Sequence, residues 1–148
     1  MTAKTDALEN ALLQLLFQNA NFANVGDATG LRGSTTAGQL FLSLHTADPG
    51  ETGNQSTSEV AYTSYARVGI NRASGTGGFT VTGNSVSPAT QPTSFPAATG
   101  GTATATHFGI GTASSGAGVL LYRGALSASI AISSGVTPQL TALSGTED

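Results

Sequence analysis

The stretch LFLSLH at residues 40–45 alternates leucine with other side chains along an extended backbone. Successive side chains of a β-strand point to opposite faces, so Leu40, Leu42 and Leu44 share one face. This period of two predicts a strand with one buried side. We expect Leu42 at the centre of the buried face and Ser43 on the opposite face.

Similar short runs recur along the rest of the chain. In the run 65–72, the apolar residues take one side, and Arg67 and Arg72 are expected nearer solvent. Prolines interrupt residues 87–102, which favours edge or loop structure there. Roughly eight short strands separated by Gly- and Ser-rich turns predict a mainly β fold, a jelly-roll-like antiparallel β-sandwich. The further expected strands are 79–81, 85–86, 106–112, 118–126, 127–133 and 136–143.

The N-terminal region carries a different period. Residues 5–20 predict a helix, with Asp6 as its cap and Glu9 in capping-box spacing. Glu9, Gln14 and Gln18 are expected to face away from the apolar face, which is formed at helical spacing by Leu8, Leu12, Leu15 and Leu16. Residues 21–38 are rich in Gly, Asn and Thr and predict an irregular, extended arm.

This pattern divides the chain into a helix and arm, residues 1–38, and a β-sandwich domain, residues 39–148. A short apolar-faced helix is marginal in isolation, so it must dock on its own domain or on a neighbour. We expect it to contact another protein subunit. The residues proposed for that contact are Leu8, Leu12, Leu15, Leu16, Phe17 and Phe22.

Composition narrows the classes of partner. Charged residues make up 9% of the 148 residues, against about 25% in an ordinary domain. A weakly charged surface loses its water cheaply, which suits a protein that lives in an assembly. The five basic residues are scattered, so we expect no nucleic-acid binding. The sequence contains no stretch of 18 apolar residues, so we expect no membrane-spanning segment. The N-terminus is amphipathic, so we expect no signal peptide there. The absence of cysteine fits synthesis in a reducing cytoplasm.

The catalytic motifs that we tested are missing. The only lysine is Lys4, so no phosphate-binding Gly-Lys-[Ser/Thr] loop exists, and there is no Gly-x-Ser-x-Gly elbow and no cysteine nucleophile. His45 lies near Asp48, so the inventory alone leaves a serine triad open. We expect His45 and His107 to be exposed or edge-strand residues without a catalytic role. The sequence therefore predicts no enzyme, no cofactor and no catalytic residue.

Two binding sites were also weighed. Residues 48–59 place Asp48, Gly53 and Glu59 at three positions of a calcium loop, but Gly50 and Thr52 stand where oxygen ligands are needed. We expect a solvated loop and no metal site. A sugar site needs exposed aromatic platforms. The candidates are Tyr62 and Tyr65, which are expected to be core or interface residues.

Two segments resemble a known family. LFLSLHTADPGETG (residues 40–53) with EVAYTSYARVGI (59–70), and then THFGIGTASSGAGVLLYRGALSASIAISSG (106–135), are similar to small virion proteins of tailed bacteriophages. The resemblance covers most of residues 39–136. The family indicated is the capsid cement (decoration) proteins, in particular the jelly-roll type of Bordetella podoviruses.

The resemblance implies a structural protein that stabilises the assembled capsid by bridging major capsid protein subunits. It implies a homodimer on the outer capsid surface of the virion. No reaction is required, because binding only the assembled lattice stabilises that state. Two alternatives stay open: a tail, baseplate or fibre component, and a carbohydrate-binding β-sandwich module.

Overall fold

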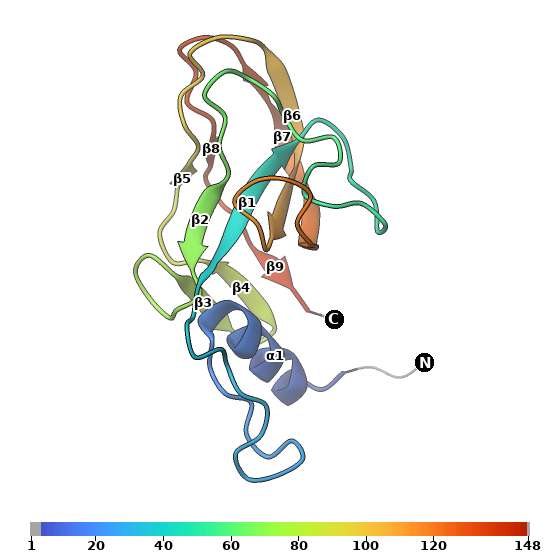
Figure 1. Cartoon of the computed structure of the whole chain (residues 1–148), viewed down its shortest axis with the longest axis vertical. Helices are drawn as coiled ribbons and strands as arrows, with labels where there is room; N and C mark the ends of the chain where they lie inside the picture. The colour runs from blue at the N-terminus through green and yellow to red at the C-terminus, as the bar shows by residue number, and fades with distance from the viewer. Residues whose placement is uncertain (1–3, 148) are drawn as a thin grey trace. The chain divides into compact units, whose positions relative to one another are not determined.

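The structure is a computed structural model that describes residues 4–147. The described residues form one helix and nine strands (Figure 1). In chain order these are α1 (Asp6–Gln18), β1 (Gln39–His45), β2 (Val68–Asn71), β3 (Phe79–Thr82), β4 (Ser85–Pro88), β5 (Thr93–Ser94), β6 (Ala103–Gly111), β7 (Leu120–Ile132), β8 (Gln139–Leu140) and β9 (Gly145–Thr146). The pairs β1–β6, β3–β4, β4–β9, β5–β8 and β6–β7 are all antiparallel. The mainly β, sandwich-like fold predicted from the sequence is therefore confirmed.

The chain forms two compact units, each assembled from segments that are distant in sequence. Unit 1 contains the described residues up to 39, residues 70–91 and residues 141–147. Unit 2 contains residues 40–69 and 92–140. The sequence divides the chain at residue 38, whereas in the structure the helix shares unit 1 with these later segments.

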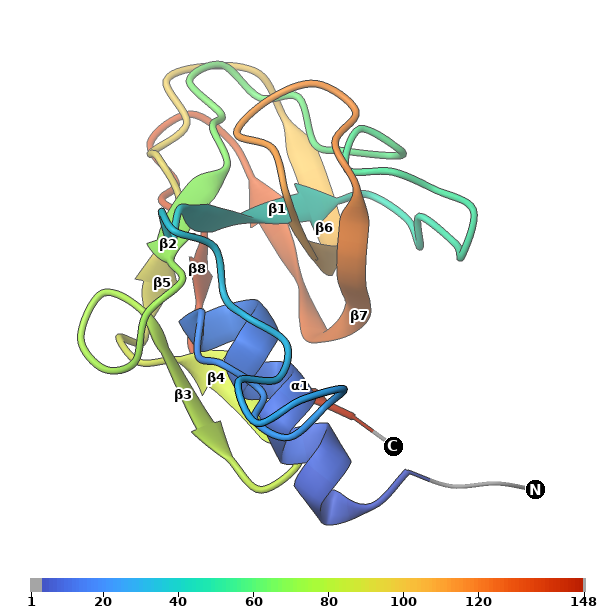
Figure 2. The ribbon, with the colours of Figure 1, turned by 60° about the horizontal axis from the view of Figure 1, so that its bottom comes forward.

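In unit 1, α1 lies across β3 and β4 (Figure 2). The residues that it buries are Glu9, Leu13 and Phe17, one helical turn apart. The Phe17 ring meets the Phe79 ring edge-on, with 4.9 Å between centroids. The buried stripe therefore lies one residue away from the predicted leucine face. Gln18 does not face away either, because its amide donates to the Phe79 carbonyl at 2.9 Å.

Both ends of α1 are capped. Thr5, and not the predicted Asp6, is the N-cap, and its hydroxyl accepts a bond from the backbone N–H of Leu8. Asn19 ends the helix in the left-handed conformation at φ 56°, which asparagine tolerates better than most residues. The guanidinium of Arg72 binds the carbonyls of Leu15 and Leu16, which the last turn leaves without helical partners.

The three-stranded sheet of unit 1 has the order β3-β4-β9. Phe79 is opposite Pro88 and Val81 is opposite Val86, so one face is apolar. The other face carries Thr and Ser. Near residue 147 the chain closes on this sheet, since the backbone N–H of Glu147 donates to the Asn84 carbonyl at 2.9 Å. Alternation of apolar and hydroxyl side chains thus gives the helix a surface to pack on.

The four-stranded sheet has the order β2-β1-β6-β7, and β2 passes from unit 2 into unit 1 after Gly69. Strand β1 lies inside this sheet, with Leu42 opposite Ile110 and Leu44 opposite Phe108. Leu42 and Leu44 are fully buried, as predicted. Ser43 is fully buried too, although the sequence places it on the solvent side. The period of two is present, but protein covers both faces.

Strand β7 is a single strand where the sequence predicts two. Its register with β6 slips, because Ala105 pairs with Ile130 and His107 pairs with Ala125. Two residues along β6 thus correspond to five along β7. This irregularity explains the apparent break at residues 126–127 in the sequence pattern. A small two-stranded pairing of β5 with β8 completes the strands of unit 2.

Candidate interaction surface

A buried arginine organises one end of unit 2. The Arg67 side chain is 2% exposed. Its Nε donates to Glu59 Oε1 and its Nη2 to Glu59 Oε2, both at 2.7 Å. This forked pairing is the strongest geometry for a guanidinium and a carboxylate, and the bonds to Glu59 raise the pKa of Arg67. The expectation that Arg67 lies near solvent is wrong, because Glu59 satisfies its charge inside the protein.

The same guanidinium binds a loop far along the chain. Arg67 Nη1 donates to the Ala113 carbonyl at 2.9 Å, and Nη2 donates to the Gly116 carbonyl at 2.7 Å. Residues 112–119 connect β6 to β7, and Glu59 directly follows residues 46–58. We call residues 46–58 and 112–119 the loop pair. Arg67 ties its two members together through the side chain of Glu59 and these carbonyls.

Gln55 makes a second connection within the loop pair. The residue is fully buried. Its Oε1 accepts a bond from the Ala113 N–H at 2.9 Å, and its backbone N–H donates to the Ala117 carbonyl at 2.8 Å. Gly111 and Gly118 leave room for this amide, since a Cβ at either position would overlap it. Hydrogen bonds of two buried residues, Arg67 and Gln55, therefore hold the two loops together.

His45 connects strand β1 to the loop pair through a hydrogen bond to Thr57. It is fully buried, so its expected exposure is wrong. Its Nδ1 lies 2.8 Å from the Thr57 carbonyl, which can only accept, so Nδ1 carries the proton. Nε2 then accepts from the Ser43 hydroxyl at 2.8 Å. Burial lowers the pKa of His45. His107 is half-buried, and its Nδ1 lies 2.8 Å from the Thr106 hydroxyl.

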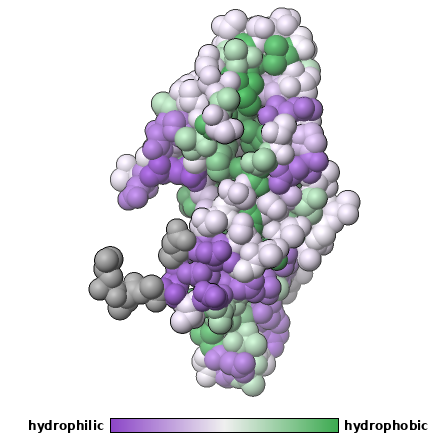
Figure 3. Space-filling model, turned by 180° about the vertical axis from the view of Figure 1, so that it is seen from behind, coloured by the Kyte–Doolittle hydropathy of each residue, from purple (hydrophilic) through white to green (hydrophobic). Residues whose placement is uncertain are grey.

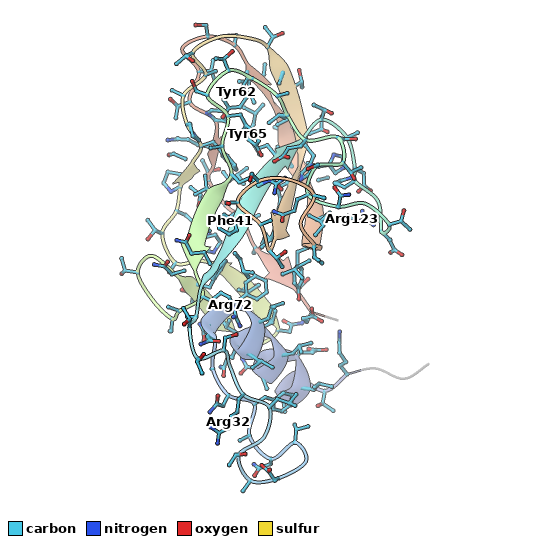
Figure 4. The ribbon with its side chains drawn as sticks, viewed as in Figure 1. Arg32, Phe41, Tyr62, Tyr65, Arg72 and Arg123 are labelled. Carbon is cyan, nitrogen blue, oxygen red and sulfur yellow. The ribbon has the colours of Figure 1, made fainter. Side chains whose placement is uncertain are left out.

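The outer rim of the loop pair carries the charged side chains of Asp48, Glu51 and Arg123. Arg123 Nη1 donates to Asp48 Oδ1 at 2.6 Å (Figure 4). The Gly50 N–H, and then Arg123, lower the pKa of Asp48. Glu51 is almost completely exposed, and Val119 is 60% exposed. The Asp48 carboxylate is thus already paired. Among residues 4–147 no group of three or more side chains is arranged to hold a metal ion.

Of the two tyrosines weighed for sugar binding, Tyr62 lies in the core and Tyr65 is half-buried beside it. Tyr62 is 4% exposed, and its hydroxyl donates to the Pro96 carbonyl at 2.8 Å. The Tyr65 ring meets the Tyr62 ring edge-on and stacks on Phe95 (Figure 4). Burial raises the pKa of both phenols. These side chains pack as core residues and offer no exposed platform to a sugar.

The six residues predicted for inter-subunit contact differ in exposure. Phe17 is fully buried in unit 1. Leu8 is 38% exposed, and the others, Leu12, Leu15, Leu16 and Phe22, are half-buried. Two more exposed apolar side chains, Val25 and Leu31, lie in the predicted arm. Within residues 4–147, no helix has the length and apolar character needed to cross a membrane.

Sequence reasoning missed the three residues that hold the loop pair: Gln55, Glu59 and Arg67. One signal was available. In a chain with so few charges, an arginine inside an apolar strand pattern and a glutamate eight residues before it are candidates for a buried pair. The amide of Gln55 had no such signal, because it lies in a loop whose composition resembles that of a solvated turn.

Comparison with known proteins identifies the class of the chain. A family model described as "Podophage GP4 fiber I protein gp80" matches residues 3–146. The chain belongs to this family, and it is therefore a structural protein of the phage fibre and a component of the virion. A search of curated proteins found no match.

The family corrects the expectation drawn from the resemblance. The prediction of a capsid cement or decoration protein is wrong, because the matching family is a fibre protein and the match spans nearly the whole chain. The fibre alternative kept open in the sequence analysis is confirmed. The segments that suggested cement proteins are turn and strand patterns, such as those around the loop pair, and these report local structure more than position on the virion.

Proposed function

We propose that this chain is a non-enzymatic subunit of the phage tail fibre, and that the loop pair is a preformed surface for contact with another virion protein. The observation that carries the proposal is the bonding of Arg67. One buried side chain fixes Glu59 and two carbonyls of residues 112–119. A surface fixed before binding loses little conformational entropy when it binds.

The surroundings of the histidines support a structural role. His45 has no exposed surface, and its ring nitrogens bind Ser43 and Thr57. A substrate would have no access to this Ser–His pair. The rim of the loop pair offers the exposed Val119 and backbone groups beside the ion pair of Asp48 and Arg123, a mixture of apolar and polar groups that suits contact with another protein surface.

Incorporation into virions tests this role. Val119→Ser changes an exposed side chain and should leave folding intact while lowering the amount of the chain in purified particles. Arg67→Met should lower it as well, by loosening both loops. Arg32→Met is the matched control, because it removes the same charge from an exposed site outside the loop pair. Circular dichroism verifies folding of each variant, and cryo-microscopy locates the chain in the fibre.

The expected result is a loss of the chain from particles for both loop variants and not for Arg32→Met. Normal incorporation of Val119→Ser and Arg67→Met would overturn the loop pair as the contact surface. Absence of the wild-type chain from the tail fibre would overturn the proposed role.

A further inference from the structure

The long edge strand β7 differs from the other strands that end a sheet. β7 contains 13 residues, whereas β2 and β3 contain four each and β5, β8 and β9 contain two each. Short edge strands protect a protein from unwanted pairing, and so do lysines and prolines on the edge. β7 has neither proline nor lysine. Its one charged residue, Arg123, is paired with Asp48 within the same chain.

The second half of β7 has the alternation of a strand that is covered on one face. Ser127, Ser129 and Ala131 are exposed, and on the other face Leu126 and Ile130 are half-buried and Ile132 is buried, with Ala128 as the exposed exception. The register slip leaves residues 126–129 without partners in β6. Among the described strands β7 has β6 as its neighbour on one side and ends the sheet on the other, so the backbone N–H and C=O groups that point away from β6 face the open edge. Figure 3, the view from behind, shows a band of apolar residues flanked by polar ones.

We propose that residues 126–132 form a seam between two copies of this chain, paired antiparallel about a two-fold axis at Ser129. The inference deepens the proposed role as a fibre subunit and rests on it. With this centre, Leu126 is opposite Ile132, and Ala128 is opposite Ile130. On the other face, Ser127 is opposite Ala131.

The self-complementary pattern selects a second copy as the occupant. Apolar side chains meet apolar ones and small side chains meet small ones, and a two-fold contact requires such a match. Residues 126–132 contain no charged side chain, so pairing two copies brings no like charges together. A charged ligand finds no opposite charge here, and a sugar finds no aromatic ring. The available chemistry is a row of backbone groups and apolar side chains, which another strand of the same kind satisfies.

A cross-linking experiment tests the centre of the seam. Opposed residues in an antiparallel pair have Cα atoms about 4.5–5.5 Å apart, within the range that a disulfide spans. The chain has no cysteine, so Ser129→Cys introduces a single thiol. Mild oxidation of the full-length variant should give a covalent dimer. Thr104→Cys is the matched control, since Thr104 is an exposed residue one strand inward, opposite Ala131.

A second variant tests the seam without oxidation. Ala131→Lys places a charge on the edge and should weaken self-association at least about tenfold in sedimentation velocity runs. Thr104→Lys places the same charge one strand inward and should leave self-association unchanged. In the wild-type chain, amide hydrogen exchange of residues 126–132 should slow as concentration rises.

Three results would overturn the seam. They are a wild-type chain that stays monomeric at all concentrations, equal cross-linking of Ser129→Cys and Thr104→Cys, and self-association that Ala131→Lys does not change. None of these removes the chain from the fibre. Failure of the seam is thus distinguished from failure of the proposed role, which is judged by the wild-type chain in purified virions.

Discussion

Arg72 donates a hydrogen bond from its Nε to the carbonyl oxygen of Leu16 at 2.6 Å, so the residue that directly follows strand β2 caps helix α1. Its Nη2 binds the Leu15 carbonyl at 2.8 Å, and its Nη1 binds the Ala37 carbonyl at 3.1 Å. The last turn of α1 has no basic residue of its own. Arg72 therefore supplies the positive charge that the negative end of a helix dipole favours.

Loss of this cap should destabilise unit 1. Arg72→Met keeps most of the aliphatic stem and removes the charged donors, so the free energy of unfolding should fall by about 2 kcal/mol. Arg32→Met, at an exposed position, should change it by less than about 0.5 kcal/mol. Urea denaturation of both variants measures the difference. Equal stability of the two would show that the Arg72 bonds are compensated by water.

The buried pair Arg67–Glu59 should show strong coupling. Arg67→Met leaves the Glu59 carboxylate without its partner, so the free energy of unfolding should fall by about 3–5 kcal/mol. The double variant Arg67→Met with Glu59→Gln removes both charges and should recover part of this loss. A double-mutant cycle by urea denaturation measures the coupling. Additive effects of the two substitutions would contradict a direct interaction.

The central strand β1 allows a test of its two faces. Leu42→Ala should cost about 2–5 kcal/mol, because the residue is fully buried. Ser43→Ala should cost about 1–3 kcal/mol, because it leaves His45 Nε2 buried without a donor. Chemical denaturation gives both values. A negligible effect of Ser43→Ala would mean that another donor reaches His45.

The buried His45 predicts a loss of stability in weak acid. Its pKa is lowered by burial, so near pH 6 the unfolded chain binds a proton more readily than the folded chain does. The contribution is fully present above the unfolded pKa of about 6.5 and declines as the pH falls below it. The free energy of unfolding should therefore decrease as the pH falls from about 7.5 to about 5. Urea denaturation at several pH values in this range measures the decrease. His45→Gln should flatten this dependence, and an unchanged slope would assign it to another group.

Among the four arginines, limited digestion with trypsin should first cleave the chain after Arg32. Arg67 is buried, and Arg72 and Arg123 have their guanidinium groups bonded within the protein. Arg32 is exposed in the segment between α1 and β1. Mass spectrometry of the first fragments measures this, and Arg32→Met should delay the cleavage. Early cleavage after Arg67 would contradict the buried network.

The sequence predicted where the first strand and the helix lie better than it predicted which of their faces are buried. The alternation at residues 40–45 located β1, and helical spacing located α1. Alternation cannot reveal that both faces of β1 are covered, because Gln55 and Thr57, which bond to β1, lie in a following loop with no regular period. The predicted buried face of α1 is one residue away from the observed one. The reason is that Glu9 lies on the buried face, whereas a charged residue is normally expected on the exposed face.

The candidate surface was less predictable than the fold. Leucines of the helix were expected to form the contact, yet the most exposed large apolar side chain described is that of Val119 in the loop pair. The loop pair depends on bonds between residues about fifty positions apart, as between Arg67 and Gly116. Such bonds leave no local pattern. The position on the virion came from the family match and not from composition.

The interleaving of the two units has a consequence for synthesis of the protein. Unit 1 joins the N-terminal helix to residues 70–91 and then to residues 141–147, and unit 2 requires the chain up to residue 140. On the ribosome, α1 emerges long before β9, which pairs with β4. Neither unit is complete until translation has nearly reached residue 147. A chain that stops before residue 140 should therefore leave both units incomplete, and one that stops between residues 140 and 145 should leave unit 1 without β9.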